Sequence, residues 1–87
     1  MKQYRSHKIV EAGKITAIEV DEDKTARIAL DTGEVITTRS GWYHQQTSRI
    51  DGDALIGGYY VRYSDGYDSW SPAGVFEDGY TEHTPAT

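Results

Sequence analysis

The residues of this chain that could do chemistry are flat aromatic rings and arginines in its C-terminal half. Tyr60, Arg62 and Tyr67 lie close together around an Asp65-Gly66 pair. Tyrosine rings stack on nucleobases, and a guanidinium group pairs bidentately with phosphate. These residue types therefore favour the capture of a small nucleotide. The alternative is a cross-strand surface cluster in which the arginine makes a cation–π contact with a ring.

A second group of candidates lies in a long segment without periodicity, between Arg39 and Gly57. Loops longer than about 12 to 15 residues are uncommon in compact domains and are often functional. Trp42 and Tyr43 in this segment either dock on the core or face a ligand, and the sequence leaves both possibilities open. The full set of candidate ligand-binding residues is Arg39, Trp42, Tyr43, Arg49, Tyr60, Arg62 and Tyr67.

The sequence lacks motifs for catalysis or metal binding. His7, His44 and His83 are far apart and do not show the spacing of a metal site, so we expect neither a metal nor a cofactor. The Gly-x-Ser-x-Gly motif of serine hydrolases is missing, and no constellation supports an acid–base pair. We therefore expect a binding protein rather than an enzyme.

Composition narrows the class of protein further. With 87 residues and no cysteine, the chain predicts one small domain with no disulfide framework, so oligomerisation is expected. The net charge of -5 argues against a protein that wraps DNA or RNA by counterion release. The sequence has no run of about 18 apolar residues, which a membrane-spanning helix would need. We therefore expect a cytosolic location.

Alternating apolar residues predict a three-stranded antiparallel meander in the N-terminal half. The first strand runs from about residue 7 to 20, with a bulge or bend at Ala12-Gly13 because glycine inside a strand usually marks one. Acidic residues 21–24 predict a hairpin loop, and residues 25–30 a second strand. Residues 31–33 predict a further turn, and 34–38 a third strand rich in β-branched residues.

A hairpin and a short helix are predicted in the C-terminal half. A two-residue Asp65-Gly66 turn would pair Val61 with Trp70. This register predicts a core face and an exposed face: Tyr59, Val61, Tyr63 and Trp70 on the first, and Tyr60, Arg62, Tyr67 and Ser69 on the second.

After this hairpin, Ser71 is the expected cap of a helix whose first residue is Pro72. The helix would present Val75 and Phe76 and end at Gly79 in a left-handed conformation. The expected fold is mainly β (α+β): an N-terminal meander, a C-terminal hairpin and a short C-terminal helix. Residues 7–80 would form a single domain, with 1–6 as an N-terminal segment and 81–87 as a tail.

Two motifs carry a resemblance to a known group of proteins. The segment from Tyr4 to Ala12 and the pattern Gly-Tyr-x-Val-x-Tyr-x-Asp-Gly-Tyr-x-Ser-Trp-Ser-Pro-x-x-x-Phe-Glu-x-x-Tyr, from Gly58 to Tyr80, resemble a family of small bacteriophage and prophage proteins. The second motif is also similar, more distantly, to phage sponges of the Thoeris anti-defence type, which sequester cyclic nucleotide immune signals. Those sponges combine an N-terminal β-sheet with C-terminal helices and act as oligomers without catalysis.

The resemblance implies a non-enzymatic phage protein acting in the host cytoplasm. The favoured expectation is an oligomeric sponge for a cyclic nucleotide signal, with no DNA, RNA or membrane partner. The alternative is an accessory protein that docks on a host or virion protein through an exposed aromatic face. The expected partners are a small nucleotide, further copies of the chain, or a host protein.

Overall fold

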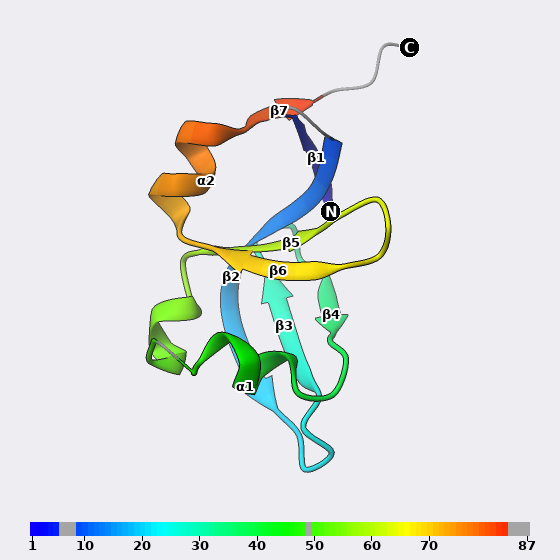
Figure 1. The fold of residues 1–87 in the computed structure, drawn as a ribbon, viewed down its shortest axis with the longest axis vertical. Helices are drawn as coiled ribbons and strands as arrows, with labels where there is room; N and C mark the ends of the chain where they lie inside the picture. The colour runs from blue at the N-terminus through cyan, green and yellow to red at the C-terminus, as the bar shows by residue number, and fades with distance from the viewer. Residues whose placement is uncertain (6–8, 49, 84–87) are drawn as a thin grey trace.

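The protein is mainly β, as the sequence predicts. The computed structural model describes residues 1–5, 9–48 and 50–83, and of 81–83 only the backbone (Figure 1). Its elements are, in order, β1 Lys2–Arg5, β2 Ile9–Val20, β3 Ala26–Leu30, β4 Val35–Thr37, α1 Trp42–Gln46, the 3-10 helix η1 Gly52–Leu55, β5 Tyr59–Arg62, β6 Asp68–Ser71, α2 Ala73–Gly79 and β7 Thr81–His83.

Strand β2 connects the whole seven-stranded antiparallel sheet. Its first half pairs with β1 on one side and β5 on the other, and its second half, from Ile15 to Val20, pairs with β3. Strand β4 continues the sheet beyond β3, β7 continues it beyond β1, and β6 pairs with β5. Because one long strand serves three neighbours, the sheet bends along it (Figure 1).

The β5–β6 hairpin crosses the middle of the molecule and separates two apolar clusters (Figure 1). The lower cluster joins the second half of β2, β3, α1 and η1, and its buried members are Ile15, Ile28, Leu30, Trp42, Leu55 and Tyr60. The upper cluster joins β2, β5 and α2, and its buried members are Val10, Ala12, Tyr59, Val61 and Phe76. The two clusters lie along the long axis of a molecule of 42 × 23 × 23 Å.

The predicted meander is confirmed in strands β2, β3 and β4. Ala26, Ile28 and Leu30 are buried on one face of β3, as their alternation predicts. The irregularity in β2 differs from the prediction, because the register shifts between Ile15 and Ala17 rather than at Gly13. Gly13 serves close packing instead, since a Cβ there would lie 2.6 Å from Leu30 Cδ1.

The predicted register of the C-terminal hairpin is wrong by one residue. Tyr60 pairs with Trp70, and Val61 with Ser69. The loop has three residues rather than two, because Tyr63 N–H donates to Tyr67 O at 2.8 Å and Gly66 N–H donates to Tyr63 O at 3.0 Å. Within this loop, Gly66 is the residue with a positive φ, of 90°. This conformation is typical of a turn followed by a glycine bulge.

The side chain of Asp65 explains the longer loop. Its Oδ1 accepts a hydrogen bond from Tyr67 N–H at 3.0 Å, which closes an Asx turn. This turn leaves Asp65 in an ordinary conformation, whereas the expected two-residue turn would need a positive φ at both Asp65 and Gly66.

The shifted register corrects the two predicted faces. Trp70 lies on the same face as Tyr60, against the lower cluster, while Tyr67 shares a face with Tyr63. Trp70 is partly buried and its Nε1 donates to Leu55 O at 3.1 Å. The expectation that Tyr60 is exposed is wrong, because 1% of it is accessible.

The long irregular segment contains two short helices, α1 and η1, that close the lower cluster. Trp42, the first residue of α1, is fully buried there and its ring lies 5.6 Å from that of Tyr60. The open question about Trp42 is thereby answered, because it docks on the core. Tyr43 is half-buried, and its hydroxyl packs so closely on Gly52 that no Cβ would fit.

Helix α2 forms where it is predicted but differs from the prediction at both ends, since it begins at Ala73 rather than Pro72. Pro72 is its N-cap, and Ser71 makes no capping bond because its Oγ donates to Pro72 O. Phe76 is buried and Val75 is exposed. Gly79 is the last helical residue and does not adopt a left-handed conformation.

Strands β1 and β7 lie outside the predicted domain of residues 7–80. β1 falls in the segment expected as N-terminal, residues 1–6, and β7 in the tail expected from residue 81. The two strands pair antiparallel, with Tyr4 opposite Glu82. Pairing with β1 therefore brings the start of the expected tail into the sheet.

We predict that Gly58→Ala destabilises the fold and that Gly74→Ala does not. A Cβ at Gly58 would lie 2.4 Å from Trp70 Nε1 and 2.8 Å from Ser71 O, and such overpacking costs about 1 to 3 kcal/mol. Gly74 in α2 has open space around its Cα, so alanine should leave stability unchanged or raise it by up to about 1 kcal/mol. Urea unfolding monitored by tryptophan fluorescence measures both. Equal midpoints for the two variants would contradict the close packing at Gly58.

Candidate functional site

The structure brings four of the predicted site residues together around one carboxylate. Asp68, at the start of β6, is 8% exposed. Its Oδ1 accepts from Arg39 Nε at 3.0 Å, and its Oδ2 accepts from the Tyr60 hydroxyl at 2.7 Å. Arg62 Nη2 donates to the same hydroxyl at 3.4 Å, and its Cζ lies 5.7 Å from the Tyr60 ring centre. Trp42 packs on Tyr60 from below.

Local hydrogen bonds fix where Arg39 enters this cluster. Thr38, which follows β4, is buried, and its hydroxyl accepts from Ala26 N–H at 3.0 Å. The next side chain, Arg39, also donates from Nη2 to Gln45 Oε1 of α1 at 2.8 Å. The guanidinium therefore links α1 to the hairpin.

These contacts describe a structural network rather than an open ligand site. The rings of Trp42 and Tyr60 are 0% and 1% exposed, so neither has a face on which a base could stack. Burial and the bond to Asp68 raise the pKa of Tyr60, which keeps its hydroxyl a donor. The bond to Tyr60 raises the pKa of Arg62. Arg39 and Arg62 both have partners within the protein.

The other predicted site residues lie apart from this network. Tyr43 packs against the lower cluster and contacts the ring of His44 edge-on, with ring centres 6.0 Å apart. Arg49 lies outside the described residues. Tyr67 is 53% exposed and belongs to the opposite face of the hairpin.

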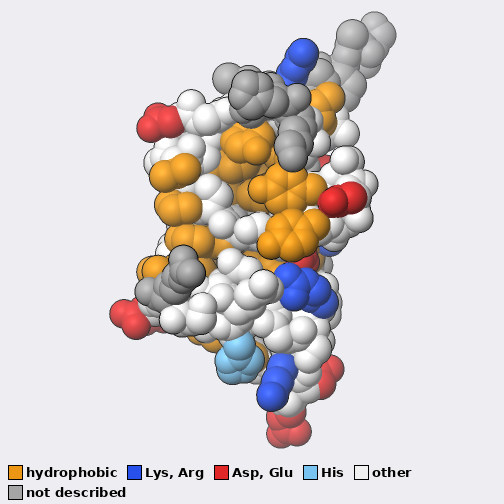
Figure 2. All heavy atoms as spheres, in the orientation of Figure 1, with side chains coloured by type: hydrophobic (Ala, Val, Ile, Leu, Met, Phe, Trp, Pro, Cys, Tyr) orange, Lys and Arg blue, Asp and Glu red, His pale blue; other side chains and the backbone are white. Residues whose placement is uncertain are grey.

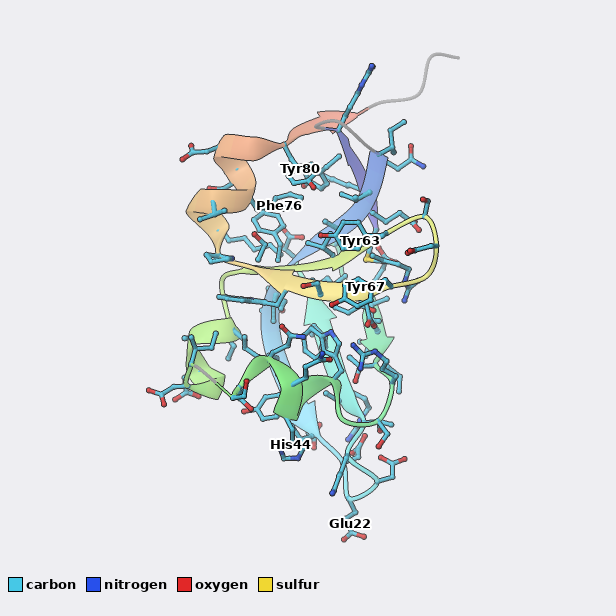
Figure 3. All side chains as sticks on the ribbon, in the orientation of Figure 1. Glu22, His44, Tyr63, Tyr67, Phe76 and Tyr80 are labelled. Atoms are coloured by element: carbon cyan, nitrogen blue, oxygen red, sulfur yellow. The ribbon has the colours of Figure 1, made fainter. Side chains whose placement is uncertain are left out.

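Tyr67 is part of an aromatic face that the sequence prediction did not assemble. Figure 2 shows apolar side chains gathered between α2 and the hairpin, and Figure 3 labels four of them: Tyr63, Tyr67, Phe76 and Tyr80. We call Tyr63, Tyr67 and Tyr80 the aromatic face, and Phe76 lies beneath it. Tyr63 and Tyr67 have ring centres 5.8 Å apart with planes inclined by 31°.

Stacked rings support this face from below. Phe76 stacks on Tyr80 at 4.6 Å and on Tyr59 at 4.3 Å, and meets Tyr4 edge-on at 4.9 Å. The Tyr59 hydroxyl donates to Glu77 Oε2 at 2.8 Å, which ties β5 to α2. Burial, and then the bond to Glu77, raise the pKa of Tyr59. The aromatic face is therefore held by both packing and a hydrogen bond.

A hollow of about 350 Å³ lies at the hairpin end of the aromatic face. Its described lining residues are Tyr63, Ser64, Asp65 and Tyr67. Partial burial, with smaller effects of Tyr80 and Tyr67, raises the pKa of Tyr63, so its phenol stays neutral at physiological pH. The hollow is thus lined by two tyrosine rings, a serine and one carboxylate.

The described residues contain no group of three His, Asp or Glu side chains arranged to hold a metal ion. Within the same part of the chain, no helix is long and apolar enough to cross a membrane.

Sequence reasoning missed Asp68, Asp65, Tyr63 and Tyr80 as site residues. Asp68 sits in a strand otherwise free of charge, and a lone acid in such a run is a signal for a buried partner. Alternation along the strand places Tyr63 on the face of Tyr59 and Val61, and there it packs on the upper cluster and is partly buried. The predicted register pairs Tyr63 with Asp68 rather than Tyr67, and so it does not bring the two rings together. A three-residue loop, which Ser64-Asp65-Gly66 also permits, would have paired Tyr63 with Tyr67.

We predict that Asp68→Ala lowers the free energy of unfolding by about 1 to 3 kcal/mol, because the buried Tyr60 hydroxyl loses its acceptor. In a Tyr60→Phe background the same change should cost less, since that hydroxyl is gone. Asp78→Ala, at an exposed position of α2, is the control and should change stability by less than about 0.5 kcal/mol. Urea unfolding compares the wild type with the three single variants and with the double variant. A cost for Asp68→Ala no larger than that of the control would show that the network contributes nothing.

Comparisons with known proteins identify no family for this chain. No protein-family model, curated protein or solved structure matches the chain. The resemblance to small phage proteins therefore stays an expectation drawn from the sequence motifs, and the candidate site is defined by the residues of this chain.

Proposed function

We propose that this chain is a non-enzymatic binding protein that docks on a partner protein through its aromatic face. The observation that carries the proposal is the exposure of Tyr67, at 53%, on a face where Tyr63 and Tyr80 also reach the surface. Tyrosine supplies large, rigid contact area at low entropic cost and is enriched at protein interfaces. A rigid support of stacked rings lowers that cost further.

The electrostatics agree with a protein partner. In Figure 2, acidic side chains lie beside the aromatic face on α2 and at the hairpin tip, and a basic side chain lies just below it. Polar groups around an apolar centre are the usual anatomy of a protein interface. A phosphate group would meet Asp65 at the hollow rather than a free guanidinium.

Capture of a nucleotide signal, the favoured expectation from the sequence, has weaker support. It needs exposed rings beside unpaired arginines, whereas Trp42 and Tyr60 are buried and Arg39 and Arg62 are bound within the network. Sequestration and phage origin rest on the motif resemblance alone. Docking on a host or virion protein in the host cytoplasm is the form of the proposal that this resemblance favours.

Site-specific crosslinking tests the docking proposal. A photoreactive benzoylphenylalanine at Tyr67, in the full chain expressed in bacterial cells, should form one discrete adduct with another protein. The control places it at Ile56, which is 47% exposed and directly follows η1, outside the aromatic face. We expect no discrete adduct from Ile56.

Equal labelling from both positions, or none from Tyr67, would overturn the proposal. A nucleotide released in equimolar amount from heat-denatured, purified protein would instead support the sponge. Mass spectrometry of the released small molecules distinguishes these outcomes.

We also propose that the chain forms a homo-oligomer, through a different surface. A shallow hollow of about 380 Å³ on the outer face of β2, β3 and β4 is lined by Ala17, Ile18, Glu19, Arg27, Ala29 and Val35. Small side chains there allow close approach of a second sheet. Within one chain Arg27 donates to both carboxylate oxygens of Asp21, at 3.1 and 3.0 Å, and its Nη2 lies 3.2 Å from Glu19. Across a two-fold axis Glu19 would pair with Arg27 of the second copy.

Light scattering at micromolar concentration should therefore give more than the mass of one chain, and Val35→Asp should return the mass to that of a monomer. Val75→Asp, at an equally exposed residue of α2, is the matched control. A monomeric wild type would contradict this prediction and leave the docking face untouched.

A further inference from the structure

We infer that Asp51-Gly52 is a site of spontaneous backbone modification, at which the aspartate converts to isoaspartate through a cyclic succinimide. The chain has three Asp-Gly pairs, at residues 51–52, 65–66 and 78–79, and it contains no asparagine. Glycine has no side chain to hinder its amide nitrogen, so at these pairs a main-chain amide most readily attacks the preceding carboxyl group. The fold protects two of the pairs and leaves Asp51-Gly52 open.

The reaction needs no reagent besides water. The Gly52 nitrogen attacks Cγ of the protonated Asp51 carboxyl group, and the carboxyl hydroxyl leaves as water with the amide proton. Water then adds to the ring at the original main-chain carbonyl carbon, and the bond from that carbon to the Gly52 nitrogen breaks. The main chain now runs through Cβ and Cγ, and the α-carboxylate becomes the side group. Addition of water at Cγ instead returns aspartate.

Few contacts hold Asp51 and Gly52 against this ring closure. Asp51 is exposed, its backbone is extended with φ −67° and ψ 145°, and its side chain makes no capping bond to η1. Among the described residues, none accepts a hydrogen bond from the Gly52 N–H. Rotation about the Asp51 Cα–C bond would break the hydrogen bond from Ala54 N–H to Asp51 O, at 3.0 Å, in a 3-10 helix of four residues.

Packing requires glycine at position 52 and so keeps this reactive pair in the chain. A Cβ at Gly52 would overlap the hydroxyl of Tyr43, which packs against the lower cluster. A larger residue at position 52 would therefore disturb α1. Variants that test the site must change Asp51 rather than Gly52.

Hydrogen bonds hold both reacting groups at Asp65-Gly66. The Asp65 carboxylate accepts from Tyr67 N–H at 3.0 Å, and the Gly66 N–H donates to Tyr63 O at 3.0 Å. Both groups must leave these partners before a ring can close. The same loop that sets the register of the hairpin therefore protects this pair.

The helix holds the third pair, Asp78-Gly79. Gly79 is the last residue of α2, so its N–H bonds the carbonyl four residues earlier. The bond from Tyr80 N–H to Phe76 O, at 2.9 Å, closes the same turn. Ring closure would unwind this turn, which carries the buried Phe76 ring.

Ageing the full chain at neutral pH tests the inference, because the three pairs serve as internal comparisons. Trypsin leaves Asp51-Gly52 in peptide 50–62 and the other two pairs in peptide 63–87. Fragmentation by electron transfer locates isoaspartate in each peptide, and methylation of the new α-carboxylate by isoaspartyl methyltransferase measures its amount. Isoaspartate should accumulate about tenfold faster at residue 51 than at 65 or 78, the factor expected when a hydrogen bond to a charged group must break first.

Unfolding and two variants provide the controls. In urea the three pairs should react at similar rates, because the fold no longer distinguishes them. Asp51→Glu should abolish the product in peptide 50–62, since the larger ring closes much more slowly. Asp51→Asn should increase it, since an amide loses ammonia more readily at neutral pH than a carboxylate loses water.

Equal rates at the three pairs in the folded chain would overturn the inference, as would faster reaction at residue 65 or 78 than at 51. A folded chain that forms no isoaspartate at residue 51, under conditions where the unfolded chain does, would overturn it too. These outcomes are independent of the crosslinking result at Tyr67.

Discussion

The structure depends on burying both faces of β5. Tyr59 and Tyr60 are neighbours in sequence, yet the alternation of a strand sends them to opposite sides of the sheet, where they are 8% and 1% exposed. Tyr59 joins the upper cluster with Phe76, and Tyr60 joins the lower cluster with Trp42. A chain of this length has little apolar surface to bury. Because β5 lies between the two clusters, a single strand contributes buried side chains to both.

This arrangement explains why the side chains on the two faces of the hairpin have different roles. On the lower face of the hairpin, Tyr60 and Asp68 are too buried to leave their polar atoms unpaired, so Arg39 and Arg62 are recruited as partners. On the upper face the strands run past the end of α2, and the rings of Tyr63 and Tyr67 remain at the surface. The proposed docking surface is thus what the upper cluster leaves uncovered.

Much of the architecture could be predicted because local patterns are strong there. The alternation of Ala26, Ile28 and Leu30 determines β3 and its buried face. Pro72 permits a helix start, and Phe76 is the residue that α2 buries. The strands at the two ends of the chain could not be predicted in this way. β1 and β7 have little apolar periodicity, and they exist because each completes the hydrogen bonds of a neighbouring strand.

By itself, the sequence determined that the chain is mainly β, that a meander lies within residues 7–38, where the structure has β2, β3 and β4, and that a hairpin and a helix follow. The tertiary structure decided the candidate site. Asp65-Gly66 is compatible with a two-residue or a three-residue loop, and the difference of one residue moves Tyr67 and the side chains of β6 to the other face relative to those of β5. Asp65 favours the longer loop through its bond to Tyr67 N–H, and packing of Tyr60 and Trp70 on one cluster fixes it. Long-range packing selects between registers that local sequence leaves nearly equal in energy, and so it decides which tyrosines reach the surface.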